Sequence, residues 1–211
     1  MTRQRTNFLR PLTSLACAIA LWGCATTPQQ IQLPGDGAVP LYTCCNLHAV
    51  EGRLHDVNYH FGTFIPLGTP VTIERVGAHD ATVLVGAQRL KVVHAFGRKS
   101  ESFEQFLHKL FVTEDPQARL RRMPAETRDL IFQGKVTPGM TRQEVLLSLG
   151  YPPTHRTPSL DSPEWNYWYN RWFSFKARFD AGGRLTEMLG VHLAVDRFLV
   201  GGPEHVASTA Q

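Results

Sequence analysis

The sequence predicts an α+β protein in which a small β-barrel is followed by two helices and a three-stranded antiparallel sheet. Strands are indicated where apolar and polar side chains alternate with period two. Such runs occupy residues 70–76, 81–85 and 89–93. A helix is indicated over residues 103–111, where apolar side chains recur at helical spacing. Residues 173–179 alternate again, with apolar side chains on one face, which is typical of a sheet with one buried side.

Residues 1–23 are expected to be an export signal. A basic segment without acidic residues precedes an apolar stretch at 11–23, which is shorter than the roughly 20 residues that span a bilayer. Leu21-Trp22-Gly23-Cys24 then resembles the lipobox of bacterial lipoproteins, in which the cysteine thiol receives a diacylglyceryl group that carries fatty acids such as palmitate. The resemblance implies lipidation of Cys24, and Ala25 after it implies an outer-membrane anchor with the protein facing the periplasm. In the alternative, the protein is exported without a lipid and Cys24 is incidental.

The charge balance excludes nucleic acid as a partner. The chain has a formal net charge of +4, but three of its arginines lie in the expected signal. From residue 24 onward there are 19 basic and 18 acidic side chains. Nucleic-acid binding requires a clear basic surplus on the folded protein, and this chain has none once the signal is removed.

The remaining chain divides by composition into a tether and two domains. The expected segments are a flexible tether at 24–39, a β-rich domain at 40–98, a connecting helix and linker at 99–123, a helix-and-sheet domain at 124–198 and a disordered tail at 199–211. Weaker strands are expected in the β-rich domain at 41–43 and 57–61. Its stretch Ile65-Pro66-Leu67-Gly68-Thr69-Pro70-Val71 resembles the entry strand of SH3-like barrels. Ser100 or Ser102 is expected to cap the connecting helix.

Residues 124–198 carry the local signals of two helices and three strands. Pro124 suits the first turn of a helix that ends at Gly134. Thr141 and Glu144 form a capping box for the next helix, which Gly150 ends. The expected strands are 164–170, 173–179 and 184–193, with a hairpin turn at 180–183.

Four motifs of this domain occur in the order found in a known lipoprotein family. They are Gly139-Met140-Thr141-Arg142-Gln143-Glu144-Val145, Leu149-Gly150-Tyr151-Pro152, Trp165-Asn166-Tyr167, and Phe179-Asp180 with Gly183-Arg184-Leu185. Residues 124–195 therefore resemble the SmpA/OmlA (BamE-like) family of outer-membrane lipoproteins. The resemblance implies a two-helix, three-strand domain that binds the β-barrel assembly machinery, other envelope proteins or phospholipid. The β-rich domain before it and the loop residues 161–163 depart from the family pattern.

Aromatic side chains are dense in residues 165–173, and a single layer of packing cannot bury rings on both faces of a strand. The candidate partner-binding residues are Trp165, Tyr167, Trp168 and Trp172. We expect contact chiefly through Trp168 and Trp172, since rings with a polar tip suit interfaces. In the alternative, the β-rich domain or the linker covers this face.

The sequence contains no motif for catalysis, metal binding or a cofactor. Cys44 and Cys45 are adjacent, whereas metal sites favour ligands spaced by two or more residues. Buried thiols or an intermolecular disulfide are expected for them. His48, His55, His60 and Asp56 are also poorly spaced for a metal. The basic run at 119–122 is expected to be solvated, with anionic lipid headgroups as the alternative contact.

The sequence therefore favours a non-enzymatic lipoprotein without a cofactor, anchored in the outer membrane, that binds protein or lipid in envelope assembly or maintenance. One alternative is a scaffold whose SH3-like domain binds cell-wall material or a short peptide. A weaker alternative is an envelope enzyme that uses Cys44 or Cys45.

Overall fold

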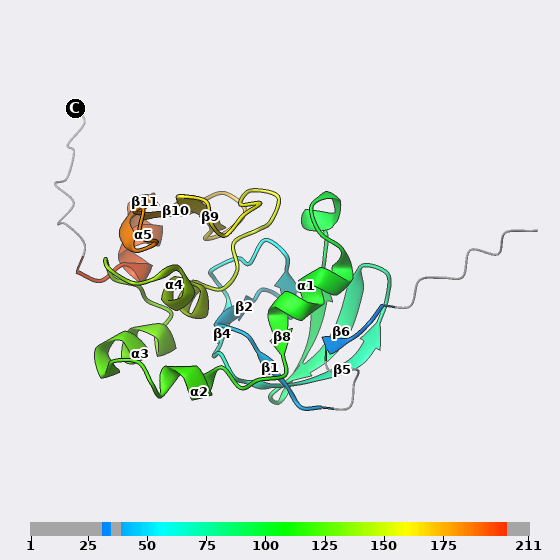
Figure 1. Ribbon diagram of the computed structural model, residues 1–211. Coiled ribbons are helices and arrows are strands. Elements are labelled where there is room, and N and C mark those ends of the chain that lie inside the picture. Colours follow the sequence, from blue (N-terminus) through cyan, green and yellow to red (C-terminus); the bar gives the residue numbers. More distant parts are fainter. Residues whose placement is uncertain (1–30, 35–38, 202–211) are drawn as a thin grey trace, which may run out of the picture. The chain divides into compact units, whose positions relative to one another are not determined.

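The computed structural model describes residues 31–34 and 39–201 (Figure 1). The expected signal, the lipidation candidate Cys24 and the chain after residue 201 lie outside the described residues. Within the described residues, no helix has the length and apolar character needed to cross a membrane. Part of the expected tether packs against the folded chain. Ile31 and Leu33 contact the hydrophobic core formed by residues between 41 and 111, which we call the first core. The amide of Gln32 donates to Glu104 at 3.3 Å.

The first sheet has six strands in the order β3-β7-β6-β5-β1-β8 and is curled. Its strands are β1 (Leu41–Thr43), β3 (Arg53–His55), β5 (Pro70–Val76), β6 (Asp80–Val85), β7 (Gln88–Val93) and β8 (Phe111–Val112). β3 runs parallel to β7, and the other pairs are antiparallel. The three strands predicted from period-two alternation are confirmed to within one residue. The strand predicted at 57–61 is wrong, because Asn58 adopts a left-handed conformation (φ 45°) that interrupts extended chain.

A two-stranded ribbon and a helix complete this part of the fold. β2 (Leu47–Ala49) pairs with β4 (Thr63–Ile65). After the short 3-10 helix η2 (Gly97–Lys99), α1 (Phe103–Leu110) packs its apolar stripe into the first core. Ser102 begins α1 with a capping box closed by Gln105, as one of the two predicted caps. The first core therefore lies between the curled sheet and α1.

The second sheet is built from three antiparallel strands in the order β11-β10-β9. The elements of this part are α2 (Gln117–Leu120), α3 (Ala125–Phe132), α4 (Arg142–Leu149), β9 (Glu164–Trp168), β10 (Ser174–Phe179), β11 (Leu185–Gly190) and α5 (His192–Phe198). The predicted capping box of Thr141 and Glu144 at the start of α4 is confirmed. The fold is thus mixed α+β, as predicted.

The predicted third strand extends too far, because α5 replaces its last residues. Gly190 has φ 153°, and a Cβ at this position would lie 2.8 Å from the Cβ of Phe175. The chain therefore leaves the sheet at a glycine, and Val195 and Phe198 of α5 are buried against the second core. Their spacing of three places both on one face of a helix.

The first part of the fold, residues 41–112, is joined to the second part, residues 117–198, by polar side chains. Asn46 is fully buried, and its amide nitrogen donates to the carbonyl oxygens of Ile131 and Ser148, the latter at 3.0 Å. Its side-chain oxygen accepts the amide of Leu67 at 3.0 Å. Both the nitrogen and the oxygen of this carboxamide are thereby hydrogen-bonded, so α3 and α4 are held against the β1–β2 connection.

Candidate binding cleft and exposed aromatic turn

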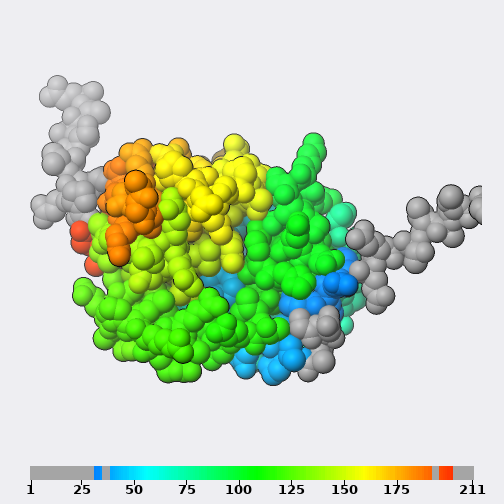
Figure 2. All heavy atoms as spheres, in the orientation of Figure 1, coloured from blue at the N-terminus to red at the C-terminus, as the bar shows by residue number. Residues whose placement is uncertain are grey.

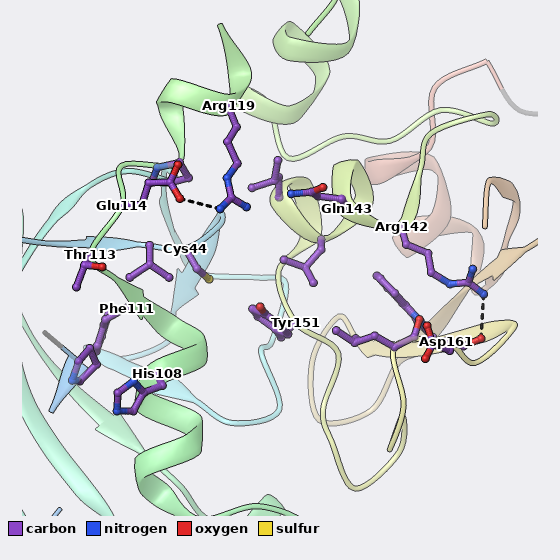
Figure 3. Close-up of a pocket in the computed structure, with 17 residues that line it drawn as sticks. Cys44, His108, Phe111, Thr113, Glu114, Arg119, Arg142, Gln143, Tyr151 and Asp161 are labelled. Carbon is purple, nitrogen blue, oxygen red and sulfur yellow. Dashed lines mark hydrogen bonds and ion pairs between the residues drawn. The ribbon is translucent and has the colours of Figure 1, made fainter. Parts of the chain in front are cut away.

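A cleft of about 710 Å³ lies where the two parts of the fold meet. One wall is the extended chain from Phe111 to Glu114, which includes β8, and the other wall is the face of α4 that carries Gln143 and Leu146. Figure 3 shows Cys44 and Tyr151 between the two walls. In the space-filling view, blue atoms from the start of the described chain are visible in a hollow between green and yellow-green residues (Figure 2).

The interior of the cleft is mostly apolar. The apolar and aromatic side chains on its lining are Pro34, Phe111, Val112, Pro116, Leu146, Leu147, Tyr151, Leu160 and Trp165. Burial raises the pKa of Tyr151, so its phenol stays neutral at physiological pH. Lys109 approaches the same ring, with its ammonium 5.5 Å from the ring centre. A ligand in this space would therefore displace water from a mostly apolar surface.

Both arginines at the rim make contacts within the protein. The Arg119 guanidinium pairs with the Glu114 carboxylate at 2.8 Å. Arg142 donates to the carbonyl oxygens of Asp161 and Ser162 at 3.1 and 3.0 Å, and its guanidinium carbon lies 4.9 Å from the ring centre of Phe179. Two arginines and two carboxylates, Glu114 and Asp161, line the cleft, so its acidic and arginine charges balance.

The cysteine pair differs from expectation. The structure joins Cys44 and Cys45 in a disulfide between neighbours in the chain, where buried thiols or an intermolecular bond were expected. The two sulfurs meet because the connection from β1 to β2 brings both side chains into the first core. Cys44 borders the cleft, whereas Cys45 is fully buried. His108, the one imidazole on the described lining, faces the carbonyl oxygen of Gln32 at 3.3 Å. Within the described residues, the cleft thus contains no thiol or hydroxyl bonded to a base.

The four aromatic candidates are divided between core and surface. Trp165 and Tyr167 are 1% and 0% exposed and belong to the second core, so they are not available to a macromolecule on the surface. Trp165 reaches only the inner edge of the cleft. Trp168 is half-buried, and its carbonyl oxygen accepts the amide of His60 at 2.9 Å. The first part of the fold therefore contacts the edge of β9 at Trp168.

Trp172 lies on an exposed turn between β9 and β10 and is 75% exposed, beside Phe173 at 42%. The side chain of Asn170 accepts the amides of Trp172 and Phe173 at 2.8 and 3.0 Å, which holds this turn in place. The Arg171 guanidinium lies 5.5 Å from the ring centre of Trp172. We call residues 170–173 the aromatic turn. It presents a large ring and a cation to solvent.

The histidines considered as metal ligands are dispersed. His48 and His60 face each other, with ring centres 5.3 Å apart, whereas Asp56 lies with His94, whose Nε2 is 3.9 Å from the Asp56 carboxylate. His55 packs against Tyr59 instead. In the described part of the chain, no three histidine, cysteine or acidic side chains converge into a group that could hold a metal ion.

His94 and Asp56 form a buried pair that sequence reasoning missed. The Asp56 carboxylate accepts the amides of Phe96 and Gly97 at 2.8 and 2.7 Å, and the His94 ring stacks on Phe106. Burial lowers the pKa of His94, opposed by the Asp56 charge. Gly97 leaves room for this pair, because a Cβ there would lie 3.2 Å from His94 Nε2. No local pattern links Asp56 to a residue 38 positions further on, so only the fold reveals the pair.

Comparison with family models, with curated proteins and with solved structures gave no match. The class of protein is therefore defined by the fold and the cleft alone: a mixed α+β protein with a mostly apolar cleft between two packed parts.

Proposed function

We propose that this protein is a non-enzymatic binding module of the bacterial envelope, anchored in the outer membrane through lipidated Cys24 and facing the periplasm. The cleft would hold an apolar segment of a partner protein that acts in envelope assembly or maintenance. The observation that carries this proposal is the cleft of about 710 Å³, with its mostly apolar lining and a rim at which Arg119 is paired with Glu114. The lipobox at residues 21–24 supports the anchor.

The charges favour a protein segment over a phospholipid as the occupant. A lipid phosphate requires an available cation, but Arg119 is paired with Glu114, and Arg142 donates to two main-chain carbonyls. A phosphate could bind Arg119 only if the ion pair with Glu114 opened. An uncharged apolar segment would bury the apolar lining and leave the contacts of both arginines intact. Burial of apolar surface is favourable, so this occupant fits the cleft better.

The aromatic turn offers a second contact for the same partner. Trp172 and Phe173 expose much of their surface at a position held by Asn170. A rigid ring loses little entropy on binding, which is why tryptophan is frequent where interfaces are strongest. The turn is therefore assigned to partner binding in this proposal, as the sequence predicts for Trp172.

Quantitative co-purification from membranes tests the cleft. The full-length protein with a C-terminal tag is recovered after gentle solubilisation, and associated proteins are measured by mass spectrometry. Gln143→Trp places a large ring at the exposed edge of the cleft. Gln133→Trp makes the same change at an exposed position outside it and serves as the matched control. We expect a defined set of envelope proteins to be depleted about tenfold by Gln143→Trp and retained with the control.

Two results would contradict the proposal. Equal recovery of all proteins with both variants would exclude the cleft as the binding site. The anchor is tested separately with Cys24→Ala and labelled palmitate. Unchanged labelling and unchanged membrane association of this variant would exclude Cys24 as the site of lipidation.

A further inference from the structure

The last strand of the six-stranded sheet is paired on one side only. β8 follows β1 in the strand order and ends the sheet, with Val112 opposite Tyr42 in antiparallel register. The Cys44 amide donates to the Leu110 carbonyl at 2.9 Å, which identifies one bonded pair of this ladder. Bonded and non-bonded pairs alternate along antiparallel strands. Val112 is thus the next residue whose main-chain groups point toward β1.

It follows that the main-chain groups of Phe111 and Thr113 point away from β1. The Phe111 amide donates to the Leu107 carbonyl at the end of α1. The Phe111 carbonyl and both main-chain groups of Thr113 make no hydrogen bond to other described residues. Thr113 is exposed, and both residues line the cleft. Phe111 is only 1% exposed, so the edge that borders the cleft offers the donor and the acceptor of Thr113.

The opposite wall of the cleft is a helix. α4 presents Gln143, Leu146 and Leu147 to the space beside this strand edge, and Figure 3 shows Gln143 across the cleft from Thr113. A groove between a strand edge and a helix accepts an extended peptide, because the edge bonds its main chain while the helix packs against its side chains. A helical occupant would leave the edge groups of Thr113 without protein partners.

We propose that the cleft binds an extended segment of a partner protein, which adds as a strand to the free edge of β8. This inference rests on the proposed function of the cleft and specifies how it recognises its partner. Side chains of an extended segment alternate in direction, so every second one would face the apolar lining near Leu146 and Tyr151. The segment would be apolar at these alternate positions and uncharged, because Arg119 is paired with Glu114 and Arg142 donates to main-chain carbonyls.

The test uses linear peptides selected from a phage-displayed library on the full-length protein, then synthesised and titrated by fluorescence anisotropy. Thr113→Pro removes the outward amide and places a ring on the strand edge, whereas Thr113→Val retains both main-chain groups. We expect the dissociation constant to rise about tenfold or more with Thr113→Pro and less than about twofold with Thr113→Val. Thermal melting verifies that both variants are folded.

A second measurement leaves the protein unchanged. Methylating alternate backbone nitrogens of a selected peptide blocks one edge of the peptide strand, so one of the two methylation patterns should abolish binding. Hydrogen exchange at the Thr113 amide should slow when the unmodified peptide is bound. Binding that tolerates both methylation patterns would overturn strand addition even if Thr113→Pro impaired folding.

The outcomes separate this inference from the proposed function. Peptides that lose affinity for Gln143→Trp but bind Thr113→Pro as well as the unaltered protein would show a functional cleft and exclude strand addition. Failure to select any peptide sensitive to Gln143→Trp would overturn strand addition. If co-purification were also insensitive to Gln143→Trp, the proposed function would fail with it.

Discussion

The Nε2 atom of His60 lies 2.8 Å from the carbonyl oxygen of Leu149, a residue 89 positions further along the chain. The other ring nitrogen lies 3.2 Å from the Trp168 carbonyl oxygen, which also accepts the His60 amide at 2.9 Å. One buried side chain from the first part of the fold thus contacts the end of α4 and the end of β9. A neutral imidazole donates through only one nitrogen, and the shorter contact assigns this proton to Nε2.

We expect the protein to lose stability in mild acid. Burial lowers the pKa of His60 to about 4, and burial together with the charges of His60 and Arg197 lowers that of His48 to about 3. Both rings are therefore neutral in the folded protein, whereas the unfolded chain binds protons near pH 6.5. Stability is complete above pH 6.5 and falls as the pH decreases toward 4 and 3. Between pH 6.5 and 5, each histidine should cost about 2 kcal/mol.

Urea denaturation at pH 7 and pH 5 measures this loss. His48→Phe keeps a ring next to His60 and Phe64 but cannot bind a proton, so its acid-induced loss should be smaller by about 2 kcal/mol. His108→Gln, at an exposed position, should leave the dependence unchanged. Identical pH dependence in the unaltered protein and His48→Phe would contradict the prediction.

Replacing Asn46 should weaken the contact between the two parts of the fold and lower the free energy of unfolding. Asn46→Ala leaves the buried amide of Leu67 and the carbonyls of Ile131 and Ser148 without their side-chain partner. We expect a loss of about 3 kcal/mol in the free energy of unfolding. Asn166→Ala removes a donor to the Arg156 carbonyl at an exposed contact and should cost about 0.5 kcal/mol. Equal losses would show that Asn46 is not a specific link.

The aromatic turn should affect binding without affecting stability. Trp172 is 75% exposed, so Trp172→Ala should change the free energy of unfolding by less than about 0.5 kcal/mol. Trp165→Ala, in contrast, removes a buried ring that packs 4.7 Å from the ring centre of Phe179, and should cost about 3–5 kcal/mol. Co-purification of envelope proteins should decrease with Trp172→Ala. Full recovery would remove the turn from the proposed interface.

The disulfide between Cys44 and Cys45 is open to direct chemical test. In the denatured but unreduced protein, iodoacetamide should modify neither cysteine, whereas both should react after reduction. In the native protein, reduction by dithiothreitol should be slowed by Gln143→Trp, because Cys44 is reached through the cleft and Cys45 is fully buried. Peptide mass spectrometry distinguishes the two sites. Alkylation without reduction would establish free thiols.

Elements with a complete local pattern were predictable from sequence. β5 coincides with the predicted 70–76, and Thr141 with Glu144 begins α4 as expected. β8 was not predictable, because a strand of two residues contains no full period and directly follows a helix. α5 was predicted as a strand in part, since only the turn at Gly190 separates its apolar residues from those of β11.

The sequence by itself determined the elements whose causes lie within a few residues, namely the period-two strands and the capping boxes. From the charge balance it also predicted that nucleic acid is not a partner. Only the tertiary structure decided which of these elements meet. Pairing β8 with β1 spans about 70 residues, and the contact between His60 and Leu149 spans 89. Such contacts are selected by the burial and hydrogen bonding of the whole chain, so no local pattern encodes the cleft that they create.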